Sequence, residues 1–414
     1  MAHPPGHGAA SGTLRSEAPA SGRHQTSRAL MTTSTDLFLQ LRVALPLALF
    51  MGLSGCASPP TPAPEVVIAA PASPEVPDGQ SIPTPVLEQT EVATPEPGNY
   101  AQRDDARLLA DRLATEFQLE PTWVFSMLSQ ARFKESITKF IMPAPNGTAK
   151  NWAVYRSRFI DPIRIKAGVT FWRTYEMDLR RAEARWGVPA SIIAGVIGVE
   201  TIYGRNTGNY RVLDALATLG LDFPKGRSDR SAFFQKELGH FLKLCNEQNM
   251  DPTTVLGSYA GALGLPQFMP SSVRNFAIDF DGNGRIDLLR SPVDAIGSVA
   301  KYLAEHGWRK DMPTYYEVTP PTDADALAKL LAPDIVPSFS VAEMQSMGAI
   351  LPDVAQTHMG LLALVKLQNG DAAPTYVTGT DNFYAVTRYN QSSYYALAVI
   401  QLGQTVSRDA SNLP

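Results

Sequence analysis

Most of the chain after residue 100 shows the three-and-four spacing of apolar residues that is typical of helices. Between Asp104 and Pro121 the apolar residues fall on one helical face, at Leu108, Leu109, Leu113 and Phe117. Large apolar side chains continue to Trp186, and Gly187-Val188-Pro189 then forms a stop signal. We therefore expect a helical domain over residues 99–189.

The helix predicted next, from Ala190 to about Tyr203, is apolar on almost every side. Such a helix needs neighbours that cover it, so we expect it at the centre of a core formed by residues 190–307. Glu200 is its only charged residue.

Residues 308–380 have a different pattern. Thr and Val alternate over 314–319, and Thr375-Tyr376-Val377-Thr378 resembles a strand, which predicts a small β-containing subdomain. Residues 381–414 are expected to return to the core, with an amphipathic helix from Tyr394 to Leu402. The fold class predicted from these patterns is mainly α (α+β).

The N-terminal residues carry targeting signals. Residues 44–55 form an apolar stretch after Arg42 that is too short to cross a bilayer and has the length of a signal-peptide core. It ends at Cys56, and Leu53-Ser54-Gly55-Cys56 resembles the lipobox of bacterial lipoproteins, in which the cysteine is acylated. We expect a leader and lipoprotein signal peptide over residues 1–55, with Met31 as a candidate for the true start. An ordinary secreted protein with an incidental cysteine is the alternative.

Residues 56–98 are expected to form a lipidated tether. Residues 57–98 contain 11 of the 33 prolines and no Lys or Arg, a composition that favours an extended chain. Ala57 rather than Asp follows the cysteine, which by resemblance to bacterial lipoproteins favours the outer membrane. The expected location is therefore the outer membrane, lipid-anchored through acylated Cys56 and facing the periplasm.

Composition and charge exclude several function classes. The chain has 414 residues, of which 36 are Lys or Arg and 40 are Asp or Glu, giving a formal net charge of -4. The chain has no excess of positive charge that would attract the phosphates of a nucleic acid, so we expect no nucleic-acid partner. His240, His306 and His358 are too scattered for a zinc motif. Cys245 has no expected disulfide partner, so we interpret it as a small buried apolar residue.

Glu200 is the strongest candidate for chemistry. Gly195 and Gly198 allow close backbone approach beside it, and apolar surroundings would raise its pKa towards neutrality, as a general acid requires. The alternative is a structural carboxylate neutralised by Arg205 or Arg211. This feature alone favours neither interpretation.

A glycine-rich stretch from Gly257 to Ser272 provides a second signal, because backbone of this kind can approach a ligand closely. The ordered motifs along the chain closely resemble the lytic murein transglycosylase B family, from about Trp152 to Leu402. These motifs are Gly198-Val199-Glu200-Thr201, Tyr203-Gly204-Arg205, Asp214-Ala215-Leu216-Ala217-Thr218-Leu219, the glycine-rich stretch and Asp294-Ala295-Ile296-Gly297-Ser298-Val299.

This resemblance implies a lysozyme-like catalytic core that cleaves the β-1,4 bond between N-acetylmuramic acid and N-acetylglucosamine in peptidoglycan, forming a 1,6-anhydro product. It implies that Glu200 is the single acid and base, with no cofactor needed for chemistry. The substrate contacts it implies are Tyr155, Ser258, Gln267, Tyr302, Tyr389 and Asn390. Without the resemblance, core packing would be the better interpretation of the tyrosines.

Two other functions stay open on the sequence. One is a non-catalytic peptidoglycan-binding lipoprotein, and the other is a lysozyme-type muramidase in which water attacks. In each case the expected partners are peptidoglycan glycan strands and outer-membrane lipid, and the expected state is a monomer.

A third motif begins at Asp279. Oxygen-bearing side chains stand at loop positions 1, 3, 5 and 9, with Gly at position 6, as in an EF-hand. The loop resembles the family's calcium loop, which closes on an aspartate corresponding to Asp294, whereas position 12 holds Arg290. The expected ligands of a structural Ca²⁺ are Asp279, Asp281, Asn283, Arg285, Asp287 and Asp294. Asx turns filled by water are the alternative.

Overall fold

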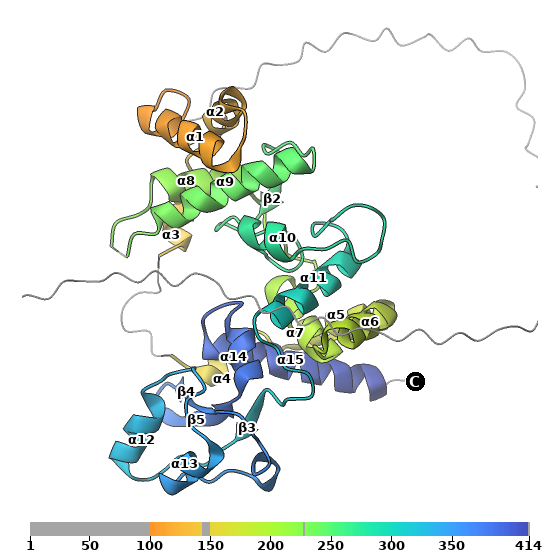
Figure 1. The fold of residues 1–414 in the computed structure, drawn as a ribbon, viewed down its shortest axis with the longest axis vertical. Coiled ribbons are helices and arrows are strands. Elements are labelled where there is room, and N and C mark those ends of the chain that lie inside the picture. The colour runs from red at the N-terminus through yellow and green to blue at the C-terminus, as the bar shows by residue number, and fades with distance from the viewer. Residues whose placement is uncertain (1–99, 143–149, 227, 413–414) are drawn as a thin grey trace, which may run out of the picture. The chain divides into compact units, whose positions relative to one another are not determined.

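The computed structural model describes residues 100–142, 150–226 and 228–412. The predicted signal peptide, Cys56 and the tether lie outside the described residues. Within them, helices dominate and strands form two small sheets (Figure 1). The mainly α fold class is therefore confirmed.

Helix α1 (Asp104–Phe117) packs on α2 (Pro121–Ser129) and α9 (Ser231–Glu247). Helix α3 (Glu135–Phe140) packs on α8 (Val212–Leu221), which in turn packs on α9. Glu120 caps α2 by accepting hydrogen bonds from two backbone N–H groups, and Pro121 is the first residue of the helix. The prediction that Leu108 lies on the core face is wrong, since it is 70 % exposed. It stands about 100° around the helix from buried Leu109.

Helices α4 (Trp152–Ser157), α5 (Pro162–Thr174) and α6 (Glu176–Trp186) follow. Helix α6 ends at Gly187, whose φ of 70° gives the left-handed cap that glycine favours. The next helix, α7 (Ala190–Thr201), is buried from Ile192 to Val199. Its chief neighbour is α15 (Ser393–Asn412), which extends well beyond the predicted end at Leu402 (Figure 1).

Two glycines let α7 and α15 approach closely. A Cβ atom added at Gly195 would lie 2.2 Å from the Val399 carbonyl oxygen, and one at Gly403 would lie 1.9 Å from that of Ser191. Any larger residue would separate the helices, so glycine sets this packing distance.

The remaining elements complete the core and a smaller apolar cluster. Strands β1 (Tyr210–Arg211) and β2 (Leu256–Gly257) pair antiparallel, and α10 (Pro270–Phe276) and α11 (Pro292–Glu305) follow. A three-stranded antiparallel sheet has the order β3-β5-β4, from β3 (Tyr315–Glu317), β4 (Ala363–Asn369) and β5 (Ala372–Gly379). The residues 375–378 expected as strand lie in β5.

Helices α12 (Ala324–Leu331) and α13 (Val341–Ser346) and the 3₁₀ turn η1 (Asp353–Ala355) accompany that sheet, and α14 (Asp381–Thr387) leads into α15. Leu330, Met344 and Leu364 belong to a buried cluster separate from the main core. The domain boundaries given above stay predictions. The two halves of residues 99–189 contact different partners, because α5 and α6 pack on α7 rather than on α8 and α9.

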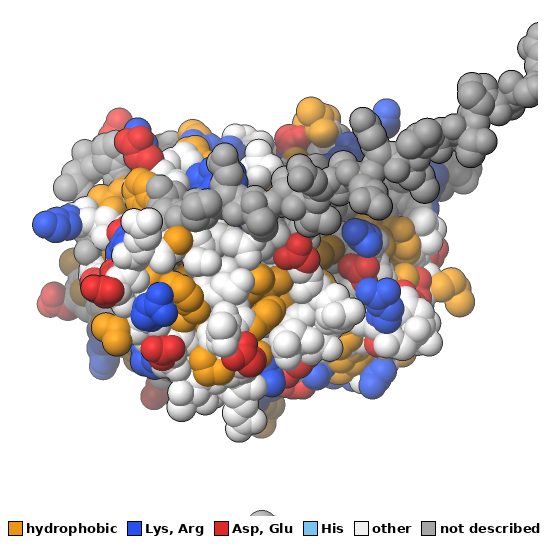
Figure 2. All heavy atoms as spheres, turned by 90° about the horizontal axis from the view of Figure 1, so that it is seen from above, with side chains coloured by type: hydrophobic (Ala, Val, Ile, Leu, Met, Phe, Trp, Pro, Cys, Tyr) orange, Lys and Arg blue, Asp and Glu red, His pale blue; other side chains and the backbone are white. Residues whose placement is uncertain are grey.

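The surface carries mixed charge. On the face in Figure 2, Lys and Arg side chains are interspersed with Asp and Glu, and hydrophobic side chains lie between them. Among the described residues, no helix combines the length and apolar composition needed to cross a membrane. Cys245 is fully buried in α9, as predicted, and burial raises the pKa of its thiol to about 12.

Candidate active site

Glu200 lies in the last turn of α7, after a fully buried run that includes Val196 and Ile197, and is itself partly accessible. The helix stops immediately afterwards, because Ile202 and Tyr203 adopt left-handed backbone angles (φ 52° and 58°). The end of a buried helix thus brings one carboxyl group to the surface.

Among the described side chains, one donates a hydrogen bond to the carboxyl group: the Tyr395 hydroxyl donates to Glu200 Oε1 at 2.6 Å. Burial raises the pKa of Glu200 from 4.5 to about 7, and the hydrogen bond from Tyr395 acts in the opposite direction. A carboxyl group with such a pKa is part protonated and part ionised near neutral pH, so it can both give and take a proton.

No guanidinium neutralises Glu200 in the described part of the chain. Arg211 Nη1 lies 3.5 Å from Asp214 Oδ1, and Arg205 is exposed. The interpretation of Glu200 as a carboxylate paired with either arginine is therefore wrong.

Tyr395 is the residue that sequence reasoning missed. It lies in α15, is only 2 % exposed, and reaches Glu200 across 195 positions of sequence. The sequence does contain a signal for this residue, because a tyrosine among Ala, Leu and Val on a buried helix face needs a hydrogen-bond partner for its hydroxyl. The sequence does not identify that partner.

Tyr155 and Tyr389 lie near Glu200 on two other elements, the helix α4 and the turn after α14. Burial and then the negative charge of Glu200 raise the pKa of both tyrosines. The Tyr389 ring stacks on that of Tyr395 at 6.1 Å between centroids, and its hydroxyl donates to the Pro266 carbonyl. The Tyr155 ring packs on Phe159 at 4.9 Å. The structure therefore brings these two predicted residues to Glu200.

Ser258 and Gln267 stand on the glycine-rich stretch, and both are partly buried. Gln267 Nε2 donates to the carbonyls of Thr207 (3.1 Å) and Gly264 (2.9 Å), which fixes the amide with its oxygen left over as an acceptor. Ser258 Oγ accepts from the backbone N–H of Ala262 at 3.0 Å, so its own hydrogen remains for donation.

Tyr302 and Asn390 differ from the other candidates. Tyr302 is 8 % exposed, its ring stacks on His306 at 3.9 Å, and its hydroxyl donates to the Arg388 carbonyl at 2.9 Å. That bond holds the turn that carries Tyr389. Asn390 is exposed on the same turn.

Leu265 connects the site to the loop of residues 279–291, between α10 and α11, which we call the acidic loop. Its carbonyl accepts a hydrogen bond from Thr201 Oγ1, next to Glu200, at 2.9 Å, and its N–H donates to the Leu288 carbonyl at 2.9 Å. The loop therefore supports the glycine-rich stretch directly.

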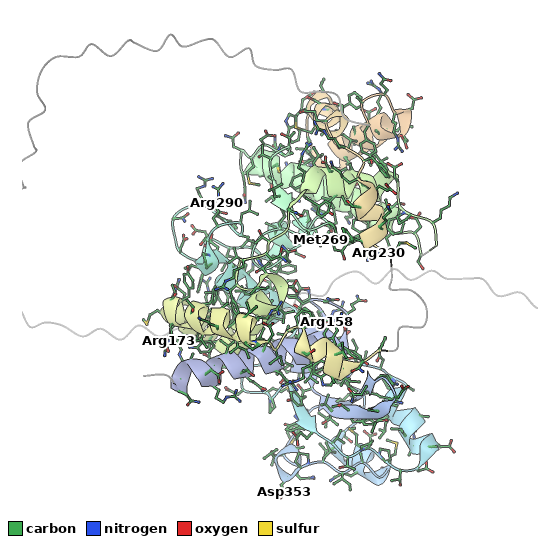
Figure 3. All side chains as sticks on the ribbon, turned by 180° about the vertical axis from the view of Figure 1, so that it is seen from behind. Arg158, Arg173, Arg230, Met269, Arg290 and Asp353 are labelled. Carbon is green, nitrogen blue, oxygen red and sulfur yellow. The ribbon has the colours of Figure 1, made fainter. Side chains whose placement is uncertain are left out.

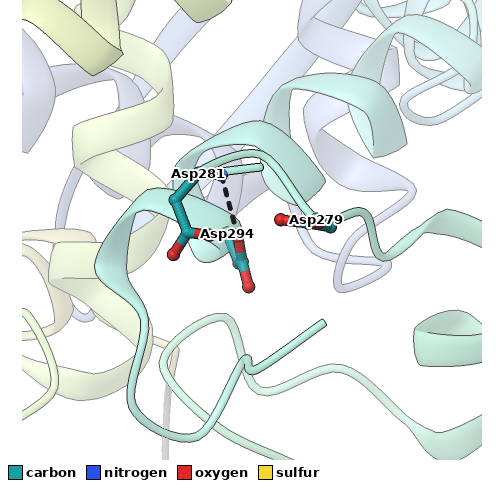
Figure 4. A group of neighbouring side chains, drawn as sticks. All are labelled: Asp279, Asp281 and Asp294. Carbon is teal, nitrogen blue, oxygen red and sulfur yellow. Dashed lines mark hydrogen bonds between the residues drawn. The ribbon is translucent and has the colours of Figure 1, made fainter. Parts of the chain in front are cut away.

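Asp279 and Asp281 of this loop and Asp294 in the first turn of α11 each place a carboxylate oxygen within 4.8 Å of the others (Figure 4). Asp294 is fully buried and accepts backbone N–H bonds from Phe280 (2.8 Å) and Asp287 (2.8 Å). The Asp287 carboxylate lies outside this group and accepts N–H bonds from Leu289 and Arg290.

The other two predicted ligands belong to the same loop, where Asn283 Oδ1 accepts a hydrogen bond from the Arg285 N–H at 2.9 Å. The six predicted ligands therefore separate into one tight group of three aspartates and three residues around it.

Comparisons with known proteins agree on one family. The model of the transglycosylase SLT domain matches residues 102–404. The membrane-bound lytic murein transglycosylase B of Escherichia coli K12 is 37 % identical over an alignment of 322 residues that covers 75 % of this chain and 84 % of that protein.

Two solved structures resemble this fold. The E. coli lytic transglycosylase Slt35 in complex with calcium is 36 % identical with a TM-score of 0.66, covering 79 % of this chain and all of that one (100 %). SltB3 of Pseudomonas aeruginosa in complex with NAG-anhNAM-pentapeptide is 26 % identical with a TM-score of 0.59, covering 73 % of this chain and 79 % of that one.

Proposed function

The chain belongs to the SLT family and is a lytic transglycosylase that acts on peptidoglycan, and from this premise we propose that Glu200 is its single general acid and base. The observation that carries the proposal is the state of the carboxyl group: partly accessible, free of any guanidinium among the described residues, and with a pKa near 7.

The proposed reaction begins with proton transfer from Glu200 to the glycosidic oxygen between N-acetylmuramic acid and N-acetylglucosamine. The bond breaks as positive charge develops at the anomeric carbon, and the resulting carboxylate then takes the proton from the 6-hydroxyl of the same sugar. That hydroxyl closes the 1,6-anhydro ring. Atoms balance without water, because the proton gained by the leaving oxygen is replaced by the one lost from the 6-hydroxyl.

An intramolecular nucleophile suits a site with one carboxyl group. Ring closure by a tethered hydroxyl has a high effective molarity, so it competes with attack by water. A muramidase needs water activated or a second carboxylate as nucleophile. Among the described residues, no second carboxyl group shifts the pKa of Glu200.

Tyr395 is a positioning residue in this scheme. Since it occupies Oε1, the proton that moves is carried on Oε2. Tyr155 and Tyr389 offer ring faces to sugars, and Ser258, Gln267 and Asn390 offer donors and acceptors to hydroxyl and acetamide groups.

The substrate is proposed to be a peptide-bearing glycan strand, which is supported by the NAG-anhNAM-pentapeptide bound to SltB3. Purified protein is incubated with peptidoglycan and the released fragments are weighed by mass spectrometry. Anhydro ends, lighter by one water than hydrolysed ends, are expected from the wild type and not from Glu200→Gln. Hydrated ends would indicate a muramidase, and binding without release would indicate a binding protein.

We also propose that the acidic loop holds a structural Ca²⁺. The donor set fits a hard cation, because three carboxylates converge and retain acceptor capacity beyond their N–H bonds. Asp279, Asp281 and Asp294 would hold the ion, with Asn283 and the Arg285 carbonyl beside them. The ion would hold the loop in place, and the hydrogen bond from the Leu265 N–H to the Leu288 carbonyl connects the loop to the Glu200 site. The calcium complex of Slt35 supports this assignment.

Membrane attachment is proposed through acylation of Cys56, with the Pro-rich segment as a tether and the outer membrane as the location. The name of the E. coli relative supports membrane attachment. Mass spectrometry of the mature N-terminal peptide tests it, since a diacylglyceryl group on Cys56 is expected, and Cys56→Ala should release the protein from membranes.

A further inference from the structure

The outer side of helix α5 carries cations and an apolar residue, and the helix contains no Asp or Glu. Its inner side packs on α7 and α15, where a Cβ atom added at Gly168 would meet Tyr203 and Val406. The outer side consists of exposed residues spaced three or four apart, which therefore share one face of the helix. We call this set the α5 face: Ile163, Lys166, Thr170 and Arg173 (Arg173 is labelled in Figure 3).

This helix belongs to a basic segment of an acidic chain. Residues 150–187 hold 9 of the 36 Lys and Arg residues but only 4 of the 40 Asp and Glu residues, a net charge of +5. The rest of the chain holds 27 basic and 36 acidic residues, a net charge of -9. A negatively charged surface would therefore attract this segment and repel the remainder, so it would orient the molecule.

The four acids of the segment do not cancel the charge of the α5 face. Each of them lies 2.6–3.8 Å from an arginine that is outside this face. The pairs are Asp161 with Arg164, Asp178 with Arg181, and Glu176 and Glu183 with Arg180.

Large apolar side chains are exposed at both ends of α5. Ile163, in the first turn, is 68 % exposed, and Met177, three residues after the helix ends, is 82 % exposed. Cations beside exposed alkyl groups suit the boundary of a bilayer, where ammonium and guanidinium groups meet phosphates and alkyl groups enter the hydrocarbon. A protein partner would favour a continuous apolar centre, and the α5 face has Lys166 and Thr170 there instead.

We propose that the α5 face docks on a bilayer that contains anionic phospholipid. The inference extends the proposed attachment through Cys56, which would keep such a surface within reach, but it does not require the acyl group. The contact is weak and is screened by salt, so the acyl anchor alone retains the protein on washed membranes. Because α7 packs on α5, docking would hold the Glu200 site near the membrane, whereas release would allow the reach of the tether.

The test measures binding of the chain without its acyl group. Residues 56–414 with Cys56→Ala are sedimented with vesicles of phosphatidylcholine, with or without about 30 % phosphatidylglycerol. Binding is expected to the anionic vesicles only, and to weaken as salt is added. Lys166→Gln combined with Arg173→Gln should weaken it about thirtyfold, since each cation near the surface contributes roughly fivefold.

Two further variants separate the α5 face from the general charge of the protein. Arg112→Gln combined with Lys236→Gln removes the same charge from exposed positions on α1 and α9, and should leave the affinity for vesicles unchanged. Ile163→Ala should weaken binding about tenfold, because it takes alkyl groups out of the lipid, and should leave the melting temperature unchanged.

Absence of wild-type binding to anionic vesicles, equal binding to both kinds of vesicle, or equal losses in the two double variants would overturn the inference. A loss of affinity for purified peptidoglycan in the Lys166 and Arg173 variant, with vesicle binding intact, would assign the face to the cell wall and overturn it too. That variant should release peptidoglycan fragments at the wild-type rate, which shows that its fold is intact. Failure of the role of Glu200 would appear in the released fragments, and failure of acylation in the mass of the N-terminal peptide.

Discussion

Glu200 and Asp294 are carboxyl groups on neighbouring helices of the same core, and their surroundings differ in one decisive respect. Glu200 lies in the last turn of α7 among apolar side chains and, of the side chains that the structure describes, accepts a hydrogen bond from Tyr395 alone. Asp294 lies in the first turn of α11, is fully buried, and accepts three backbone N–H bonds from the acidic loop. Few donors leave a carboxyl group able to exchange a proton, whereas many donors compensate the burial of a charged one.

The strongest test of this comparison replaces Glu200, the carboxyl group with apolar surroundings. Glu200→Gln keeps the shape and removes the transferable proton, so kcat should fall about 10³-fold. Release of anhydro fragments, followed by mass spectrometry, measures the rate, and circular dichroism confirms the fold. A variant with more than a tenth of wild-type activity would contradict the assignment.

The sequence reveals much of this site because the helix from Ala190 is apolar on nearly all sides and carries one charge. It does not reveal Tyr395, because that contact depends on how closely α7 and α15 pack, which Gly195 and Gly403 decide in three dimensions. The wrong prediction for Leu108 has a related reason: the spacing of apolar residues does not determine how far around the helix the buried face extends.

On the other side of the comparison, Asp294→Ala should lower the free energy of unfolding by about 3 kcal/mol, because it leaves buried N–H donors of the loop without a partner. The loss should be present with chelator as well as with calcium. Urea denaturation in both conditions measures it.

The matched control is Asp281→Ala, since Asp281 is exposed. It should retain most stability in chelator but lose the stabilisation that calcium gives the wild type. If calcium fails to raise the wild-type melting temperature, the proposal of a metal at this loop is wrong.

The pH dependence of stability separates the two groups further. The folded pKa of Glu200, about 7, is above its ordinary value of 4.5, so between these values the native state holds a proton that the unfolded state has released. Raising the pH through this window therefore lowers wild-type stability. Glu200→Gln has no group that titrates here, so its stability relative to the wild type should rise from pH 4.5 and level off above pH 7, at about 3 kcal/mol.

Denaturation of the wild type and Glu200→Gln at a series of pH values checks this prediction. Parallel curves for the two proteins would mean that Glu200 titrates normally.

The smallest expected effect belongs to Tyr395→Phe. Removing the hydroxyl raises the pKa of Glu200, because its hydrogen bond lowers that pKa, and kcat should fall about fivefold as the carboxyl group loses its orientation. The pH–rate profile should shift to higher pH. Tyr394→Phe is the control, since the Tyr394 hydroxyl accepts a hydrogen bond from the Gln368 N–H instead. Equal pH–rate profiles for the two variants would contradict a role for Tyr395 in orienting Glu200.

The most direct measurement is an NMR titration of the Glu200 side-chain carbon in protein labelled with ¹³C-glutamate, assigned by comparison with Glu200→Gln. The account predicts a midpoint near pH 7, separate from the exposed glutamates. A midpoint near 4.5 would show a permanently ionised carboxylate at neutral pH and would contradict the role of Glu200 as the acid.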